Sequence, residues 1–297
     1  MRKKKKIKKG RIVFFLFMVL IGVIISYQKL EKSKLEITNK DFVNLITEKT
    51  FKEESIIETL AKKTIEVSNP IKALNQNYQK YITTLPDNPK EEEPKVPILY
   101  FYNTHSTEEY SPSTYAEFSI NPTVIMNNYI LQDFFEKKGY ASIVEESSIS
   151  EILKTNHWNY ASSYKASRIL IEDAKNKYPS LEYFVDIHRD SLAKEKTSTI
   201  IDDKEYARIL FIIGMENPNY SENLQFTEKI NQKIEEYYPG LSKGIYKKSG
   251  AGVNGIYNQD FSPHTILIEI GGFENTTTEV LNSSLAFARC LWEVIHE

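Results

Sequence analysis

Three short apolar segments, each leading into polar residues, constrain the fold of this chain more than any other feature. They are residues 98–108 (ILYFYNTHSTE), 183–190 (YFVDIHRD) and 266–272 (ILIEIGG). Continuous apolar runs of this length predict central strands of a sheet that is covered on both faces. In open sheets, polar residues that gather at the carboxyl ends of such strands mark the ligand crevice. We therefore expect the functional site at the ends of these three strands.

The remainder of the C-terminal part alternates between strand and helix patterns. We expect strands at 140–145 and 208–214, helices at 122–139, 159–177 and 221–238, a glycine-rich loop at 247–258, and a last helix that a capping box at 276–279 begins. The first of these helices has Asn121 as its expected N-cap and Pro122 at its first position. Alternating strands and helices predict an α/β fold with a mostly parallel sheet flanked by helices.

The charge of the chain is distributed unevenly. Residues 1–11 carry eight Lys and Arg and no acid, and the remaining residues carry 30 basic and 40 acidic side chains. A body this acidic disfavours nucleic-acid binding, which depends on Lys and Arg that neutralise phosphates. Residues 12–27 are almost entirely apolar and offer no small-x-small signal-peptidase site. We expect a cytoplasmic tail at 1–11 and an uncleaved transmembrane anchor at 12–27, which would place the rest of a single-pass protein outside the cell membrane.

Two further regions follow the expected anchor. Residues 28–95 have weak helical periodicity and end in a segment rich in proline and glutamate, so they predict a helical stalk and linker. Residues 96–297 then form the expected catalytic domain. Cys290 is the only cysteine of the chain, which excludes an intrachain disulfide and a cysteine-based zinc site.

The two strand-end histidines suggest a metal site. His105 and Glu108 are three residues apart after the first strand, and His188 comes from another strand end. Two histidines and one glutamate form a common zinc ligand set that keeps one position open for water. Glu109 and Glu117 are alternatives to Glu108. Either histidine alone would more often be an ordinary strand-end residue with satisfied hydrogen bonds.

The acidic residues near these histidines have distinct expected roles. Glu269 lies inside an apolar strand, where a carboxylate is costly unless it is paired or has a task. We expect it to be the general base, and a structural ion pair is the alternative. Asp186 and Asp190 share a strand face with His188, so either could accept the second imidazole N–H of a ligating histidine.

Other polar residues carry weaker signals. Arg189 is on the opposite strand face from His188 and is a candidate for substrate binding or for a structural role. The amides and carboxylate of Asn258, Gln259, Asp260 and Asn275 are candidates for holding a peptide or a sugar amide.

The motifs around these residues resemble the stage II sporulation protein P family of cell-wall hydrolases. The resemblance rests on residues 102–110 (YNTHSTEEY), 186–191 (DIHRDS), 257–263 (YNQDFSP) and 268–276 (IEIGGFENT), and it covers about residues 96–297. The zinc and catalytic roles of the family carry over to His105, His188 and Glu269. Two adjacent glutamates stand where family members often show one.

The resemblance implies a membrane-anchored zinc-dependent N-acetylmuramoyl-L-alanine amidase with possible endopeptidase activity on peptidoglycan. It also implies a fold similar to zinc-dependent cell-wall amidases and action at the engulfing mother-cell membrane during sporulation. The implied partners are the sporulation transglycosylase stage II sporulation protein D and a multispanning membrane anchor protein.

Two other functions remain open at this point. A zinc carboxypeptidase or endopeptidase on stem peptides would use the same ligands, and a carboxypeptidase would need a cation such as Arg189, Arg168 or Arg208 for the substrate carboxylate. The second alternative is a non-catalytic envelope scaffold with a degenerate site.

Overall fold

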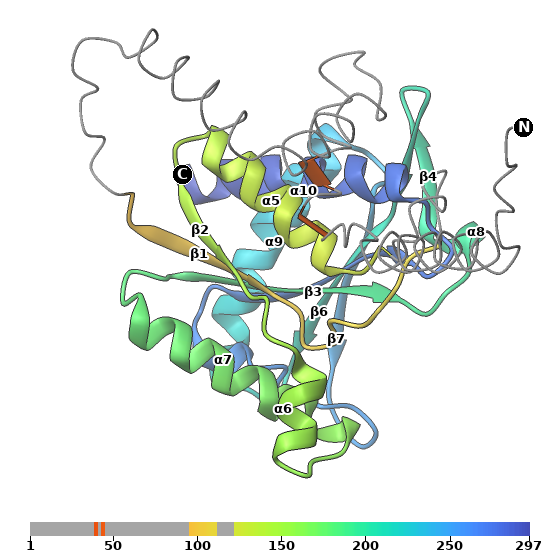
Figure 1. Ribbon diagram of the computed structural model, residues 1–297. Helices are drawn as coiled ribbons and strands as arrows, with labels where there is room; N and C mark the ends of the chain where they lie inside the picture. Colours follow the sequence, from red (N-terminus) through yellow and green to blue (C-terminus); the bar gives the residue numbers. More distant parts are fainter. Residues whose placement is uncertain (1–38, 41–42, 45–94, 112–121) are drawn as a thin grey trace, which may run out of the picture. The chain divides into compact units, whose positions relative to one another are not determined.

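The computed structural model describes residues 39–40, 43–44, 95–111 and 122–297. At its centre is a six-stranded sheet in the order β2-β1-β3-β8-β6-β7 (Figure 1). The strands are β1 Pro97–Tyr102, β2 Ala141–Val144, β3 Tyr183–Asp190, β6 Ile209–Gly214, β7 Ser242–Lys248 and β8 Thr265–Gly272. β2, β1, β3 and β8 run parallel, whereas β6 and β7 run antiparallel to them. The predicted α/β fold with a mostly parallel sheet is confirmed.

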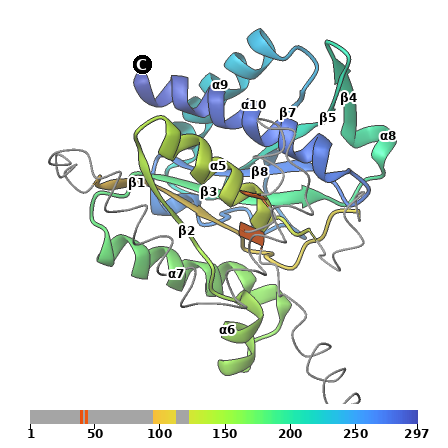
Figure 2. The same cartoon turned by 45° about the horizontal axis from the view of Figure 1, so that its top comes forward.

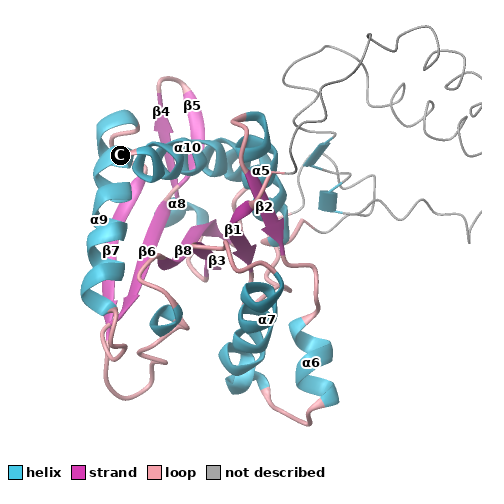
Figure 3. Cartoon of the chain, turned by 90° about the vertical axis from the view of Figure 1, so that its left-hand side faces the viewer, coloured by secondary structure: helices cyan, strands magenta, loops and turns pink. Residues whose placement is uncertain are grey.

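Helices cover both faces of this sheet. They are α5 Ile125–Lys137, α6 Ile149–Thr155, α7 Ser163–Lys177, α8 Lys194–Thr197, α9 Tyr220–Tyr237 and α10 Thr277–His296, with 3-10 turns η2 Tyr160–Ser162 and η3 Gln259–Phe261. Helices α5 and α10 lie together on one face, and α6 and α7 lie on the other (Figures 2 and 3).

The side chains of the strands alternate between these two layers. Phe101 packs against Phe135 of α5, and Phe211 packs against Phe287 of α10. On the other face Tyr100 and Tyr102 form a buried cluster with residues of α7. Both faces of the sheet are therefore shielded from water, which explains why the sequences of the central strands are continuous apolar runs.

The capping box predicted for the last helix is confirmed. The Thr276 hydroxyl accepts the backbone N–H of Glu279, and the Glu279 carboxylate accepts the N–H of Thr276. The fully buried Glu279 carboxylate also accepts the Ser198 hydroxyl at 2.6 Å and lies 3.1 Å from the Lys194 ammonium. These contacts begin α10 directly after β8 and hold the carboxyl end of that strand.

The helix predicted to begin at Pro122 begins instead at Ile125, and no side chain caps its N-terminus at Val124. The reason is a short β-type contact: the N–H of Tyr110 donates to Pro122 and the N–H of Val124 donates to Glu108. This backbone pairing holds residues 122–124 outside the helix. Residue 121, the expected N-cap, lies outside the described residues.

Several further elements were not predicted. They are the short helices α6 and α8, the 3-10 turn η3, the edge strand β7, and a hairpin of β4 Ser198–Ile201 and β5 Lys204–Ala207. The sequence of β7 is SKGIYKK, which is polar because an edge strand faces solvent on one side. Only its last two residues, 247 and 248, fall in the segment in which a loop was expected.

The prediction of a membrane location requires correction. No helix within residues 39–40, 43–44, 95–111 and 122–297 is long and apolar enough to cross a membrane. The expected cytoplasmic tail, anchor and nearly all of the stalk fall in residues 1–94, which are largely outside the described part of the chain. The domain boundaries at 11, 27 and 95 stay predictions.

Candidate functional site

The three polar strand ends meet at one edge of the sheet. Tyr102 of β1 is in register with Asp186 of β3, and His188 of β3 is in register with Glu269 of β8. After β1 the chain turns at residues 104–107, and the N–H of Glu108 donates to the His105 carbonyl at 3.0 Å. This turn brings residues 105 and 108 back toward β3. The sequence prediction that these segments converge is therefore confirmed by the register of the strands.

His188 is the central residue of this cluster and is 4% exposed. Its Nδ1 atom lies 3.6 Å from Glu108 Oε2, and its Nε2 atom lies 3.0 Å from Asp186 Oδ1, although the latter contact lacks hydrogen-bond alignment. Burial alone would lower the pKa of His188, but the charges of Asp186 and Glu108 outweigh it and raise that pKa to about 10. Without a metal, the two carboxylates therefore favour the protonated form of His188.

The Glu108 carboxylate is held in place from a second side. Its Oε2 atom accepts the backbone N–H of Arg189 at 3.1 Å. Burial would raise the pKa of Glu108, but the hydrogen bond and the charge of His188 lower it below the usual value. The neighbouring Glu109 is exposed and its backbone carbonyl accepts the guanidinium of Arg189. Of the two adjacent glutamates, Glu108 is the one whose carboxylate the structure places beside His188.

His105 lies close to His188. The two rings are 5.2 Å apart and meet edge to face. The Nδ1 atom of His105 is buried and has no hydrogen-bond partner within the described part of the chain. Burial lowers the pKa of His105, and the adjacent His188 charge lowers it further. A buried, unpartnered imidazole nitrogen is a costly feature that a bound cation would relieve.

The geometry fits the ligands of a zinc ion in part. Two ligands that share zinc at about 2.1 Å lie roughly 3.4 Å apart, and Glu108 Oε2 and His188 Nδ1 are 3.6 Å apart. The unpartnered His105 Nδ1 atom is a suitable third donor. However, no group of three His, Cys, Asp or Glu side chains within the described ranges forms a ready-made metal cluster. Zinc at these residues stays a prediction. Glu117, an alternative ligand, lies outside the described residues.

Glu269 faces this cluster from β8. Burial raises the pKa of Glu269, and the charge of Asp190 raises it further, while His188 and Lys248 act in the opposite direction. Among the described residues no ion pair ends on the Glu269 carboxylate. The structural ion pair considered from the sequence is therefore absent from this part of the chain. A half-buried carboxylate with a raised pKa beside a polar cluster is typical of a general base.

Asp190 and Arg189 have partners of their own. The Asp190 carboxylate accepts the Lys243 ammonium of β7 at 2.7 Å and the backbone N–H of Leu192 at 3.1 Å. The Arg189 guanidinium donates to the backbone carbonyls of Glu109 and Asp190. Asp186, rather than Asp190, is thus the carboxylate that contacts the second imidazole nitrogen of His188.

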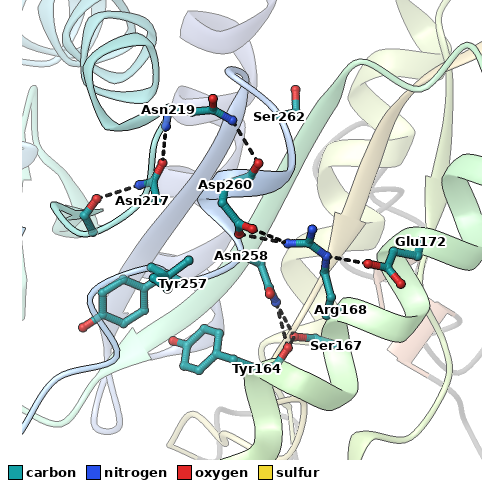
Figure 4. A network of polar contacts seen from close by, with 12 residues as sticks. Tyr164, Ser167, Arg168, Glu172, Asn217, Asn219, Tyr257, Asn258, Asp260 and Ser262 are labelled. Carbon is teal, nitrogen blue, oxygen red and sulfur yellow. Dashed lines mark hydrogen bonds and ion pairs between the residues drawn. The ribbon is translucent and has the colours of Figure 1, made fainter.

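The four polar residues proposed for substrate recognition are used inside the fold. Gln259 bridges β6 by accepting the Gly214 N–H and donating to the Ile212 carbonyl. Asn275 accepts the Gly272 N–H and donates to Ser198. Asn258 and Asp260 fasten the loop before β8 onto α7 through Ser167 and Arg168 (Figure 4). A substrate role for these four residues stays a prediction.

Two tyrosines beside the histidines received no role from the sequence. The ring of Tyr160, which is 66% exposed, stacks on His105 with centroids 4.6 Å apart. Tyr164 meets the His105 ring edge to face at 5.8 Å. They are four residues apart in the segment predicted as a helix, a spacing that places two side chains on one helix face and would have indicated that the two tyrosines lie together. In the structure Tyr160 lies in η2 and Tyr164 in α7.

Three solved structures have partial similarity to this chain at low identity. The CwlD amidase of Clostridioides difficile, in complex with the GerS lipoprotein, has a TM-score of 0.44 at 12% identity over 67% of this chain and 96% of that one. Cwp6 of Clostridium difficile has a TM-score of 0.41 at 11% identity, covering 67% and 29%. A metallo-carboxypeptidase of Burkholderia cenocepacia has a TM-score of 0.38 at 10% identity, covering 71% and 60%. All three scores lie below 0.5, and none supports an inference about activity.

The sequence comparisons are stronger. Stage II sporulation protein P of Bacillus subtilis (strain 168) is 33% identical over 219 residues, which cover 70% of this chain and 54% of the relative. The chain therefore matches about half the length of that protein. The model of the stage II sporulation protein P (SpoIIP) family matches residues 18–292 of this chain. With most of its length and its strand-end motifs inside that match, this chain belongs to the stage II sporulation protein P family.

Proposed function

We propose that this chain is a zinc-dependent peptidoglycan hydrolase that cleaves the amide between N-acetylmuramic acid and L-alanine. The observation that carries the proposal is the placement of His188: its Nδ1 atom faces Glu108, its ring lies against His105, and Glu269 stands in register with it on the next strand. Membership of a sporulation family supports a role in removing septal wall during engulfment.

His105, Glu108 and His188 would hold the zinc ion. When bound there, zinc supplies Lewis acidity for the amide carbonyl and for water. Glu269 takes a proton from the attacking water, which adds its oxygen to the carbonyl carbon. As the C–N bond breaks, the same carboxyl passes the proton to the leaving amine of L-alanine. The raised pKa of Glu269 suits a group that must accept a proton and then return it.

The occupied arginines favour this amidase over a carboxypeptidase. Arg189 donates to two backbone carbonyls, Arg168 pairs with Glu172 and Asp260, and Arg208 donates to the Ser242 carbonyl. Arg189 and Arg168 are thus engaged in holding the fold, whereas the buried Nε atom of Arg208 has no hydrogen-bond partner within the described residues. An endopeptidase, which needs no receptor for a substrate carboxylate, remains an outcome of the test below.

The test uses the full 297-residue chain. Zinc content is measured in the purified protein, and products of purified peptidoglycan are identified by mass spectrometry. We expect stoichiometric zinc, glycan strands without peptide, and released peptides with a free L-alanine amine. Loss of cross-links with L-alanine still attached would indicate an endopeptidase instead. A protein without zinc that leaves the wall intact after zinc addition would contradict the proposal and favour a scaffold.

We also propose the two partners that the family resemblance implies. They are the sporulation transglycosylase known as stage II sporulation protein D and a multispanning membrane anchor protein. Co-purification of either protein with the full chain, compared with a chain of unrelated sequence, tests them directly.

A further inference from the structure

A line of buried polar residues leads from the loop before β8 to His188. The Asn258 amide donates to Ser167 Oγ at 2.9 Å, and the hydroxyls of Ser167 and Thr104 are 2.8 Å apart. The Thr104 hydroxyl donates to Asp186 Oδ2 at 2.6 Å, and Asp186 Oδ1 lies 3.0 Å from His188 Nε2. None of the five residues is more than 7% exposed. The line joins the loop, α7, the end of β1 and β3.

The number of hydroxyl protons limits which group can donate in each hydrogen bond of this line. A hydroxyl has a single proton to donate, and the Thr104 proton goes to the Asp186 carboxylate, the strongest acceptor within reach. With that proton committed to Asp186, a bond between the two hydroxyls needs Ser167 as its donor, and the Tyr164 carbonyl, 3.2 Å from Ser167 Oγ, competes for the same proton. The Ser167 hydroxyl in turn accepts from the Asn258 amide. The line ends on the Asp186 carboxylate, whose Oδ1 atom makes a charge contact with His188 Nε2 at 3.0 Å without hydrogen-bond alignment.

Both oxygens of Asp186 are fixed by one residue. Thr104 donates its backbone N–H to Oδ1 at 2.8 Å and its hydroxyl to Oδ2. A fully buried carboxylate is costly without such partners. With both oxygens held, the position of Oδ1 beside Nε2 is set by the turn that also carries His105. The two histidines are thereby positioned by one segment.

The Asn258 end of the line is also held by several contacts. Asn258 has a left-handed backbone, with φ 56°, and its amide also donates to the Tyr164 carbonyl at 3.0 Å. Two residues later, both Asp260 oxygens accept Arg168 Nη1 at 2.9 Å (Figure 4). The loop before β8 is thus clamped to the start of α7, and Ser167 cannot move without it.

We propose that this line, Asn258–Ser167–Thr104–Asp186, is a positioning device that holds the His188 ring with Nδ1 toward Glu108. The proposal rests on the proposed function, in which Nδ1 is the zinc-binding atom. Thr104, Ser167 and Asn258 act through Asp186 and His188 and touch neither zinc nor substrate. Partners of this kind around a metal ligand change metal affinity by about 10- to 100-fold when they are removed.

The test compares isosteric variants in the full chain. Thr104→Val removes the hydroxyl at constant shape and should weaken zinc binding by about tenfold or more, measured by chelator competition. Thr104→Ser keeps the hydroxyl and should bind zinc like the parent. Ser167→Ala should give a smaller loss, because Asp186 keeps both Thr104 donors. Thr227→Val is the matched control: Thr227 is fully buried and bonds the Asn223 carbonyl within α9.

A second readout needs no zinc. In the metal-free protein, the long-range proton–nitrogen spectrum of the His188 ring reports the environment of Nε2–H. We expect that signal to shift in Thr104→Val and to be unchanged in Thr227→Val. An unchanged His188 spectrum and unchanged zinc affinity in a folded Thr104→Val protein would overturn the proposal. If instead the parent chain binds no zinc, the proposed function fails, while the ring spectrum still decides whether the line holds His188.

Discussion

Two regions of this protein carry the polar residues that the sequence singled out, and they differ in how their polar atoms are used. In the loop around residues 258–260 every highlighted side chain has internal partners, from the Gly214 N–H to the Arg168 guanidinium. At the strand ends, His105 has a buried nitrogen without a hydrogen-bond partner among the described residues, and Glu269 is half-buried with a raised pKa. Satisfied polar groups build the fold, whereas unsatisfied ones indicate a place for a ligand.

The largest effect is expected from loss of a histidine. His105→Ala and His188→Ala should each weaken zinc binding by more than about 100-fold, beyond the range for residues that only support a ligand. His264→Ala is the control, since His264 pairs with Glu182 and stacks on Tyr183 outside the site. Chelator competition measures the affinity, and circular dichroism establishes that each variant is folded. Parent-like zinc binding in both histidine variants would contradict the ligand assignment.

Glu269→Gln should affect rate and leave zinc in place. The change keeps the shape of the side chain and removes the proton acceptor, so wall cleavage should fall by at least about 100-fold. Thermal stability should hold or rise, because a partly buried carboxylate that has no ion-pair partner in the described part of the chain becomes a neutral amide. Product release from peptidoglycan, zinc content and melting temperature are measured on the same sample. Full activity in this variant would remove Glu269 from the mechanism.

A smaller effect separates the two adjacent glutamates. Glu108→Gln should weaken zinc binding by about tenfold or more, because Glu108 is the carboxylate beside His188 Nδ1. Glu109→Gln serves as its matched partner and should bind zinc like the parent, since Glu109 is exposed. The reverse order of affinities would transfer the ligand role to Glu109.

The stability of the metal-free protein should depend on pH through His188. The folded-state pKa of His188 is raised from 6.5 to about 10, so the imidazolium stabilises the fold fully below pH 6.5. That stabilisation should be lost as the pH rises from 6.5 to about 10. Denaturant unfolding at several pH values measures it, and His188→Gln should have a flatter profile over that window. Equal slopes for the two proteins would show that His188 is not charged between its carboxylates.

The smallest effect on the site is expected from the loop. Gln259→Ala strands the Gly214 N–H and the Ile212 carbonyl, so the free energy of unfolding should fall by about 2–3 kcal/mol. Zinc affinity and cleavage by the folded fraction should stay at the parent level. A selective loss of substrate affinity in a stably folded variant would instead return Gln259 to the binding site.

The sequence was informative where one physical rule acts on a local segment. The buried strands were predicted from apolar runs, and the capping box at Thr276 and Glu279 from the types of two residues. The edge strand β7 and the hairpin β4–β5 were not predicted, because half-exposed strands have a mixed polar and apolar composition. The start of α5 was misplaced because a backbone contact with residues 108–110 competes for residues 122–124.

For the site, residue types and spacing determined which residues could do chemistry: two histidines and two acids at the ends of apolar strands. Only the tertiary structure decided which polar side chains are already satisfied, that Asp186 rather than Asp190 faces the His188 ring, and that Glu108 rather than Glu109 lies at its other nitrogen. Local sequence encodes strand and helix through short-range periodicity. The partner of a polar atom depends on segments as much as 160 residues apart, as in the bond from the Tyr110 hydroxyl to the Ile270 carbonyl, which no local pattern records.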